Sequence, residues 1–307
     1  SYIDKPVEPA KVIYSGSWFG DELEIDYANN TGVGTGTASI TCGGVTASVD
    51  FAISAADMVM NGMAFASLRD AIAAAKQTPG ADTITLLQDI EVSSWTVINT
   101  DVTITANKAV TITATDDQTG GMFRITDGTF TVEGVSEDAK ITLAAGKSTT
   151  HIISNNGGNV VLTNVALAGN KNTVHTGNNK THGIFNDAGT VTAKSVDIAN
   201  ITKGDSIYVL DGTTVNLDNV TITGSGRYGI KVKGTLNISN TVHSDHALSI
   251  SGSVDHAIDV ENGGQVACNF ENVPADTDLI NLFENMRKGL NVRRGGNAEL
   301  SYVNEVN

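Results

Sequence analysis

A glycine recurs along this chain at intervals typical of a repeat protein. From about residue 80 onward, short segments of alternating apolar residues end in an Asp- or Asn-rich corner closed by glycine, as in MFRITDG (122–128) and SIYVLDG (206–212). The closing glycines stand 22 to 32 residues apart and are Gly128, Gly157, Gly189, Gly212, Gly234 and Gly263. Self-similarity at a period of ~20–50 residues indicates a solenoid, in which each unit forms one coil.

The alternation inside each unit predicts the kind of solenoid. Apolar residues two apart indicate short strands, and a strand that occurs once per coil must pair in parallel with the strand of the coil before it. We therefore expect an all-β parallel β-helix with Ile207, Val209, Ile230 and Val232 in its interior. A β-sandwich is the alternative, but it needs hairpins with strands every ~8–12 residues, and Asn-Gly hairpin turns are not systematic here.

The two ends of a solenoid expose apolar interior and must be capped. Residues 67–76 place Ser67 at a helix N-cap with Asp70 three positions later, so we predict an N-terminal capping helix with one apolar face. At the other end, residues 278–288 fit a last strand or a short helix, and the sequence does not choose between them. We interpret the basic cluster there as a solvated end cap; its members are Arg287, Lys288, Arg293 and Arg294.

Residues 11–54 do not share the glycine register. They alternate around an Asn-Asn-Thr-Gly turn at 29–32, which predicts a separate small β module. We expect residues 1–55 to form this module and residues 56–307 to form the capping helix and the β-helix.

Charge and composition exclude several functions. The chain has 19 basic and 34 acidic residues, a net charge of −15, so a nucleic acid is not an expected partner. It contains no apolar stretch of the ~18 residues that a membrane span needs, which predicts no membrane insertion. Cys42 and Cys268 are too few for a disulfide framework and are interpreted as buried thiols. With so few charges, the surface must consist largely of Thr, Ser and Asn, which suits an extracellular protein, and we expect a monomer.

Two segments resemble known families. The string IDYANNTGVGTGTASIT (25–41), followed by VDFAIS (49–54), resembles small extracellular repeat modules of Gram-positive surface proteins. The string VMNGMAFASLRDAIAAAKQTPGADTITLLQDI (59–90) resembles the start of adhesin-like right-handed β-helix domains. These resemblances imply a right-handed β-helix on the surface of a bacterium or secreted from it.

An enzyme is the alternative to an adhesin. Right-handed β-helices often carry polysaccharide lyases or glycoside hydrolases, whose chemistry needs carboxylates that converge on a sugar. Asp116 and Asp117 lie about 110 residues before the segment Arg227–Lys231, and this separation argues against a shared site. His243, His246 and His256 could bind a metal, but a strand sends His243 and His246 to opposite faces, so we interpret all three as surface or corner histidines. We therefore predict no catalytic residue, no metal and no cofactor.

The binding hypothesis depends on an outward row of side chains. If the residues five and three before each corner glycine point inward, the residue four before it points outward. That row is Arg124, Ile153, Phe185, Tyr208, Lys231 and Asp259, where Lys231 is one position nearer to its glycine than the others; His151, Leu210 and Tyr228 lie beside the row. Exposed Ile, Phe and Tyr are unexpected in solvent and would suit a sugar or a protein. We expect Ile153, Phe185, Tyr208, Leu210, Tyr228, Arg124 and Lys231 to bind a host or neighbouring-cell glycoprotein or glycan, an immunoglobulin being one possibility. Alternatively, the insertion 169–182 folds over this face and covers it.

A second periodic feature predicts structure. Asn164, Ser195, Asn219 and Asn240 follow their glycines by six or seven residues, which predicts a ladder of side chains that bond the backbone at a corner.

Overall fold

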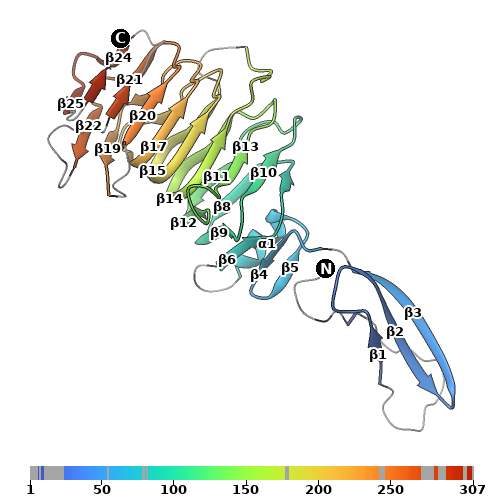
Figure 1. Cartoon of the computed structure of the whole chain (residues 1–307). Helices are drawn as coiled ribbons and strands as arrows, with labels where there is room; N and C mark the ends of the chain where they lie inside the picture. Colours follow the sequence, from blue (N-terminus) through green and yellow to red (C-terminus); the bar gives the residue numbers. More distant parts are fainter. Residues whose placement is uncertain are drawn as a thin grey trace.

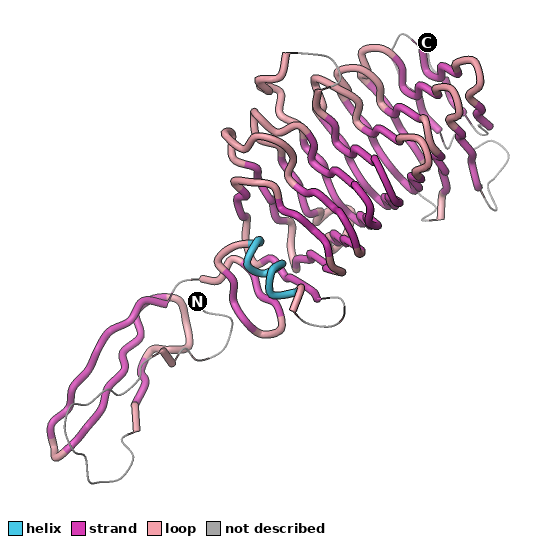
Figure 2. Tube along the Cα trace, turned by 180° about the vertical axis from the view of Figure 1, so that it is seen from behind, coloured by secondary structure: helices cyan, strands magenta, loops and turns pink. Residues whose placement is uncertain are grey.

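The chain folds as an almost entirely β protein, 59% strand and 3% helix, with a right-handed parallel β-solenoid as its main body (Figure 1). The computed structural model describes residues 6, 8–9, 24–53, 55–77, 80, 82–176, 180–241, 246–270, 280–282, 288–299 and 303–305. The strands stack as three parallel ladders that run side by side along the solenoid (Figures 1 and 2). The predicted fold class is confirmed.

Each ladder takes one strand, or one part of a long strand, from each coil. Ladder 1 contains β8 (Thr96–Asn99), β11 (Phe123–Asp127), the start of β14 (His151–Ala168), the start of β15 (His182–Ala199), β16 (Ile207–Val209), β18 (Ile230–Val232), β21 (His256–Val260) and β24 (Lys288–Val292). Ladder 2 contains β6 (Asp82–Leu86), β9 (Val102–Ala106), β12 (Thr129–Glu133), the middles of β14 and β15, the start of β17 (Thr214–Thr223), β19 (Thr235–Ser239), β22 (Gln265–Asn269) and β25 (Asn297–Glu299). Ladder 3 contains β7 (Ile90–Val92), β10 (Val110–Ala114), β13 (Ile141–Ala144), the ends of β14, β15 and β17, β20 (Leu248–Ser251), β23 (Ile280–Leu282) and β26 (Val303–Glu305).

Strict alternation of apolar and hydroxyl residues builds these strands. β9 and β10 both read VTITA, and in both the valine, isoleucine and alanine are buried while the threonines face outward. Ile207, Val209, Ile230 and Val232 are fully buried, as predicted, and pair in parallel across β16 and β18. The stacked interior is one continuous hydrophobic core from the capping helix to Ile280.

The N-terminal end is closed by a hairpin and a helix. Helix α1 (Leu68–Ala75) begins at Ser67, whose Oγ accepts a hydrogen bond from the backbone N of Asp70, 3.2 Å away, as the sequence predicts. Its buried face consists of Leu68, Ala71, Ile72 and Ala75. β4 (Met58–Met60) and β5 (Met63–Phe65) form an antiparallel hairpin, and β4 also pairs with β6, so it covers the edge that β6 would otherwise leave open.

The ladder 1 register differs from the predicted one in a single coil. Ile153 pairs with Phe123 and Ile184 and is fully buried, so the prediction that it points outward is wrong. The strand shifts register between Asn155 and Asn159, and the second glycine of the pair Gly157–Gly158 stands at the level of Gly189. Counting back from Gly157 therefore misplaces the row by one residue, and Ser154 takes the outward position.

Two asparagines lie inside the solenoid at this corner. Asn155 and Asn186 are fully buried neighbours, and Asn155 Nδ2 donates to Asn186 Oδ1 at 3.0 Å and to the Gly158 carbonyl at 2.9 Å. Asn186 Nδ2 donates to the Thr214 carbonyl of the next coil at 3.1 Å. Buried amides that are fully bonded fix the corner at low cost. Alternation of apolar residues does not predict this internal pair.

The predicted corner ladder is confirmed in part. Asn164, Ser195 and Asn219 lie at one corner with φ of 52°, 53° and 56°, a region that asparagine tolerates better than most residues. Asn164 bonds the backbone carbonyl of Gly134, as predicted, at 3.2 Å. Ser195 and Asn219 instead donate to the carboxylate of Glu137, at 2.7 and 2.6 Å, so an acidic loop residue joins this ladder.

Three antiparallel strands form a separate small sheet: β1 (Asp26–Ala28), β2 (Gly34–Cys42) and β3 (Val45–Ile53). β3 is exposed along most of its length. Cys42 is exposed beside the turn between β2 and β3, so the interpretation of this residue as a buried thiol is wrong; Cys268 is half-buried. Residues 11–23, part of the predicted β module, lie outside the described residues.

Candidate binding face

The outward face of ladder 1 differs from the rest of the solenoid surface because its side chains are large. Across successive coils the central row reads Arg124, Ser154, Phe185, Tyr208, Lys231, Asp259 and Asn291. A second row, where the chain enters these strands, contains His151, His182, Asp205, Tyr228 and His256. A third row, where it leaves them, contains Asp187, Leu210, Lys233, Glu261 and Arg293. We call this surface the ladder 1 face.

Aromatic rings stack in the middle of the ladder 1 face. The ring centroid of His151 lies 5.1 Å from that of His182 and 4.9 Å from that of Phe185, with interplanar angles of 19° and 13°. Tyr208 meets Phe185 edge-on, at 5.7 Å and 77°. The prediction that Phe185 and Tyr208 lie side by side on adjacent coils is confirmed. We call His151, His182, Phe185 and Tyr208 the aromatic stack.

The orientation of these rings decides what they can bind. Because His151, His182 and Phe185 are nearly parallel and one coil spacing apart, their faces meet one another and their edges point outward. The ammonium of Lys231 lies 4.5 Å from the ring centroid of Tyr208 and 3.3 Å from its hydroxyl. Aromatic edges carry partial positive charge, so this surface suits oxygen atoms of a partner, whereas a sugar ring that needs a free aromatic face does not stack on Phe185.

A charged cluster continues the ladder 1 face toward the C-terminal end. The guanidinium of Arg293 holds the Asp259 carboxylate with two hydrogen bonds, of 2.7 and 3.2 Å, although Asp259 is fully buried. Arg293 also reaches the hydroxyl of Tyr228 at 3.2 Å and Glu261 at 3.4 Å. Glu261 joins Lys231 and Lys233, each at 3.2 Å. Burial would raise the pKa of Glu261, but Lys231 and Lys233 hold it below its usual value.

Two titratable groups of the second row, His182 and Asp205, are buried, and His151 is half-buried. Burial lowers the pKa of His182 to about 3 and that of His151 to about 4, so both rings are neutral near pH 7. His182 Nδ1 donates to the backbone carbonyl of Asp205 at 3.2 Å. Burial raises the pKa of Asp205 to about 6; one of its oxygens accepts from the Tyr228 backbone N at 3.3 Å, and Oδ2 has no partner among the described residues.

Several predicted site residues lie on the ladder 1 face but are less accessible than expected. Tyr208, Tyr228 and Lys231 are only 8%, 5% and 6% exposed, because neighbouring cations and rings cover them. Arg227 lies 4.4 Å above the ring of Tyr228, and His256 stacks on that ring at 5.5 Å. Lys231 is an interior member of the charged cluster, held between Glu261 and the Tyr208 hydroxyl.

Apart from the fully buried Ile153, the remaining predicted residues keep accessible surface. Arg124 is exposed, and Phe185 and Leu210 are half-buried. The insertion 169–182 hydrogen-bonds at the corner before β14, where Val174 N donates to the Lys147 carbonyl at 3.0 Å and His175 to the Ser148 carbonyl at 3.1 Å. These bonds hold the described part of the insertion at that corner. Residues 177–179 lie outside the described residues.

Sequence reasoning missed His182, Asp205 and Arg293 as members of this surface. His182 and Asp205 precede their corner glycines by seven residues, as Tyr228 precedes its own by six, and this second offset was a readable signal. Arg293 was assigned to an end cap, but β24 adds one more coil and brings it beside Asp259. Of the segment 278–288, Ile280–Leu282 is strand, β24 begins at Lys288, and residues 278–279 and 283–287 lie outside the described residues.

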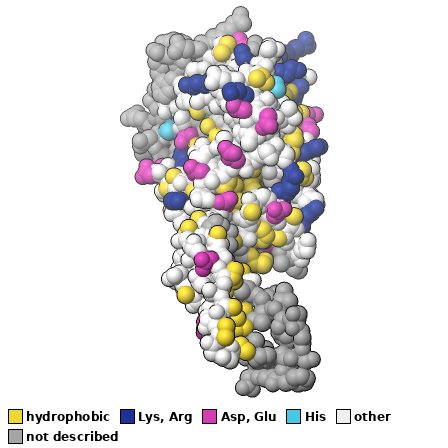
Figure 3. Space-filling model, turned by 90° about the vertical axis from the view of Figure 1, so that its right-hand side faces the viewer, with side chains coloured by type: hydrophobic (Ala, Val, Ile, Leu, Met, Phe, Trp, Pro, Cys, Tyr) yellow, Lys and Arg dark blue, Asp and Glu magenta, His cyan; other side chains and the backbone are white. Residues whose placement is uncertain are grey.

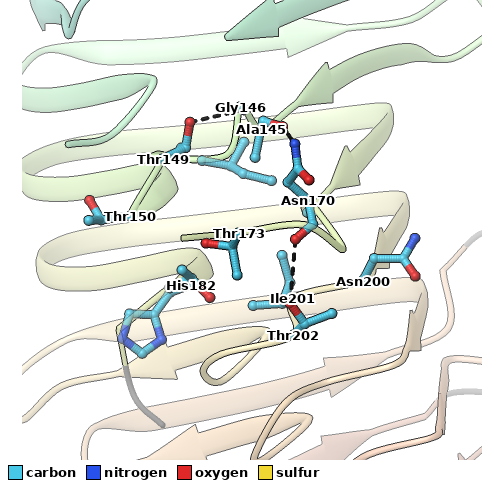
Figure 4. A pocket seen from close by; sticks show the side chains of 13 residues that line it. Ala145, Gly146, Thr149, Thr150, Asn170, Thr173, His182, Asn200, Ile201 and Thr202 are labelled. Atoms are coloured by element: carbon cyan, nitrogen blue, oxygen red, sulfur yellow. Dashed lines mark hydrogen bonds between the residues drawn. The ribbon is translucent and has the colours of Figure 1, made fainter. Parts of the chain in front are cut away.

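A small cavity lies behind His182 but cannot hold a ligand. Hydrogen bonds from Asn170 to the Ala145 carbonyl and from Thr202 to the Asn170 carbonyl close it on one side (Figure 4). Its volume is about 10 Å³, room for one water molecule at most. His243 lies outside the described residues, and among those that are described no three His, Cys, Asp or Glu side chains gather as metal ligands.

Charged side chains are unevenly distributed on the solenoid surface. Figure 3 shows Lys and Arg gathered along one edge of the solenoid and Asp and Glu over the middle of the same side.

Within the described part of the chain, no helix is long and apolar enough to cross a membrane. Comparison with protein-family models, with curated proteins and with solved structures gives no match for this chain.

Proposed function

We propose that the chain is an adhesin-type binding domain whose ladder 1 face recognises a protein, glycoprotein or glycan of a host or neighbouring cell. The aromatic stack carries this proposal: His151, His182, Phe185 and Tyr208 form a continuous row on the outside of the solenoid, where its fold needs no large side chain. Phe, Tyr and Arg, which this row combines with Arg227 and the charged cluster, are side chains enriched at protein interfaces. An immunoglobulin is one partner of this class, and the proposed location is the surface of a bacterium or the medium around it.

The geometry favours contacts through oxygen and aromatic edges. Phe185 is the central ring with accessible surface, whereas Tyr208 supports Lys231 from within. A partner that inserts a carbonyl, carboxylate or hydroxyl between Phe185 and Arg124 meets partial and full positive charge. The overall charge of −15 disfavours a nucleic acid or any other polyanion.

A carbohydrate-active enzyme is the second candidate, and Asp205 is the observation that favours it. A glycosidase needs one carboxyl group kept protonated and a second one nearby, and burial raises the pKa of Asp205 to about 6. However, Asp205 is 0% exposed, and the nearby carboxylate of Asp259 is occupied by Arg293. A proton donor must reach the glycosidic oxygen, so the binding function is better supported.

A paired screen tests the two candidates. The purified protein is applied to a glycan array and to immobilised host glycoproteins, while a panel of polysaccharides is incubated with it and assayed for new reducing ends. The proposal expects saturable binding without turnover. Depolymerisation that disappears in Asp205→Asn would overturn it in favour of the enzyme.

A further inference from the structure

A groove between the capping helix and β8 has the chemistry of a sugar site. Helix α1 packs beside β8 at the N-terminal end of ladder 1 (Figure 1). Between them lies a groove of about 360 Å³, lined by Arg69 and Lys76 from the helix side and by Trp95, Val97 and Asn99 from β8 and the corner before it. We call it the Trp95 groove.

The indole of Trp95 lines the groove and packs against the backbone of the next coil. It lies so close to Gly120 and Gly121 that a Cβ on either glycine would overlap indole atoms. Trp95 is half-buried, and Val97 beside it is 47% exposed. An aromatic face bordered by open space is what a pyranose ring stacks on, and it is the feature that the aromatic stack lacks.

The charges of the groove select the kind of sugar. Two cations, Arg69 and Lys76, line it, and none of the described lining residues is acidic, in a chain whose net charge is −15. Ser94 Oγ accepts a hydrogen bond from the Arg69 guanidinium at the border of the groove, where Arg69 also lines a neighbouring pocket with Asp70 and Glu91. A guanidinium binds a carboxylate through paired hydrogen bonds, and a nearby ammonium adds a point charge.

We propose that the Trp95 groove binds a terminal sugar that carries one carboxylate, stacked on Trp95 with its carboxylate between Arg69 and Lys76. The acidic remainder of the chain repels a polyanion, so the site fits an isolated acidic residue at the end of a glycan better than a polyuronate chain. The groove opens onto the ladder 1 face, since Val97 pairs with Arg124. It therefore deepens the proposed function and rests on it: one end of the partner glycan would lie here.

Titration of the full chain tests this site. Trp18 lies outside the described residues, so Trp18→Phe leaves Trp95 as the sole indole and its fluorescence as the readout. Three oligosaccharides share a neutral core and end in sialic acid, in glucuronic acid or in the unmodified core. We expect both acidic forms to bind at least about tenfold more tightly than the neutral form, as charge-assisted hydrogen bonds imply.

Variants separate stacking from charge. Trp95→Ala, followed by calorimetry, should lose about tenfold or more for the acidic forms, and Trp95→Phe should retain most of the affinity. Arg69→Met with Lys76→Met should reduce the acidic forms to the affinity of the neutral one, while circular dichroism confirms the fold. Equal affinity for all three sugars, or acidic-sugar binding unchanged in Trp95→Ala, would overturn the inference.

Phe185→Ala distinguishes this inference from the proposed function. It should leave binding of these short sugars unchanged, because they occupy the groove alone, but weaken binding of a large partner. If a glycoprotein binds in a Phe185-dependent way and no acidic sugar binds, the groove inference fails and the adhesin proposal stands. If the acidic sugars bind and no large partner does, the groove inference stands and the adhesin proposal fails.

Discussion

Ladders 1 and 2 share one backbone pattern, but the outward side chains of ladder 2 are mostly short, whereas those of ladder 1 are mostly large and aromatic or charged. From β9 to β22 the central outward row of ladder 2 reads Thr103, Thr131, Val161, Thr192, Asn216, Asn237 and Ala267, and Glu299 of β25 ends it. These short side chains satisfy one another, as where Asn237 donates to Asn216 at 2.8 Å. Ladder 1 instead carries rings and buried ion pairs. Since the solenoid forms equally well with either set, the large side chains of ladder 1 are more than the fold requires, which is what a binding surface predicts.

The largest expected effect comes from opening the charged cluster of the ladder 1 face. Arg293→Met leaves the fully buried Asp259 carboxylate with Asn291 as its remaining side-chain donor among the described residues, and should lower the free energy of unfolding by about 3 kcal/mol. Urea denaturation near pH 7 measures this. Adding Asp259→Asn removes the orphaned charge and should recover most of the loss. If Arg293→Met is as stable as the wild type, the ion pair between Arg293 and Asp259 is solvated.

The next effect depends on pH and again belongs to ladder 1. In the folded protein the pKa values of His151 and His182 are lowered to about 4 and about 3, whereas in the unfolded chain both have the ordinary value of 6.5. Below pH 6.5 the unfolded chain therefore binds protons that the folded protein does not. The stability that these two residues give above pH 6.5 is lost as the pH falls. Asp205, with its pKa raised to about 6, acts in the opposite sense: its folded form keeps the proton, which restores part of the stability on acidification. From pH 7 to pH 5 the net loss should be about 2 kcal/mol by linkage.

Denaturation at pH 5, 6 and 7 measures this loss, and Asp205→Asn is its control. Because the variant lacks the compensating carboxyl group, its loss over the same interval should rise to about 4 kcal/mol. Identical pH profiles for the two proteins would mean that Asp205 is solvated and titrates normally.

A smaller effect is expected at the corner outside the ladder 1 face. Asn219→Ala removes the bonds to Glu137 and Ser195 and puts alanine at a φ of 56°, so it should cost about 1–2 kcal/mol without affecting binding. Asn219→Gly should cost less, because glycine accepts this conformation. Thermal unfolding and partner binding are measured together; loss of binding at unchanged stability would make this corner part of the site.

The smallest effect should come from the ladder 2 face. Thr192→Ala removes an outward hydroxyl whose bond from Asn216 is long, at 3.4 Å, and should change the free energy of unfolding by less than about 0.5 kcal/mol. Chemical denaturation measures it. A loss comparable to that of Arg293→Met would erase the contrast between the two faces.

The sequence predicts the solenoid well because its cause is local. Alternation in segments such as VTITA sets which side chains are buried, and the Ser67 cap sets where the helix begins, so both could be read from neighbouring residues. The error at Ile153 arose where a glycine pair allowed two registers, and only pairing with the next coil decides between them.

The candidate site was predicted less completely because it depends on contacts between coils. Phe185 and Tyr208 were correctly placed side by side, but ring orientation follows from packing against His151 and His182, which alternation does not encode. The partnership of Arg293 with Asp259 joins residues 34 positions apart through the position of the last ladder 1 strand. The Trp95 groove could not be predicted because it depends on the contact of Gly120 and Gly121 with the indole of a neighbouring coil.

The affinity of Phe185→Ala relative to Thr192→Ala for a partner found by the binding screen tests the central claim most directly. Both residues belong to β15, one on each ladder, so the two variants differ in face and not in strand. The account predicts that Phe185→Ala lowers affinity by at least about 2 kcal/mol, roughly 30-fold, while Thr192→Ala binds as the wild type does. Equal affinities of two folded variants would contradict the assignment of binding to the ladder 1 face.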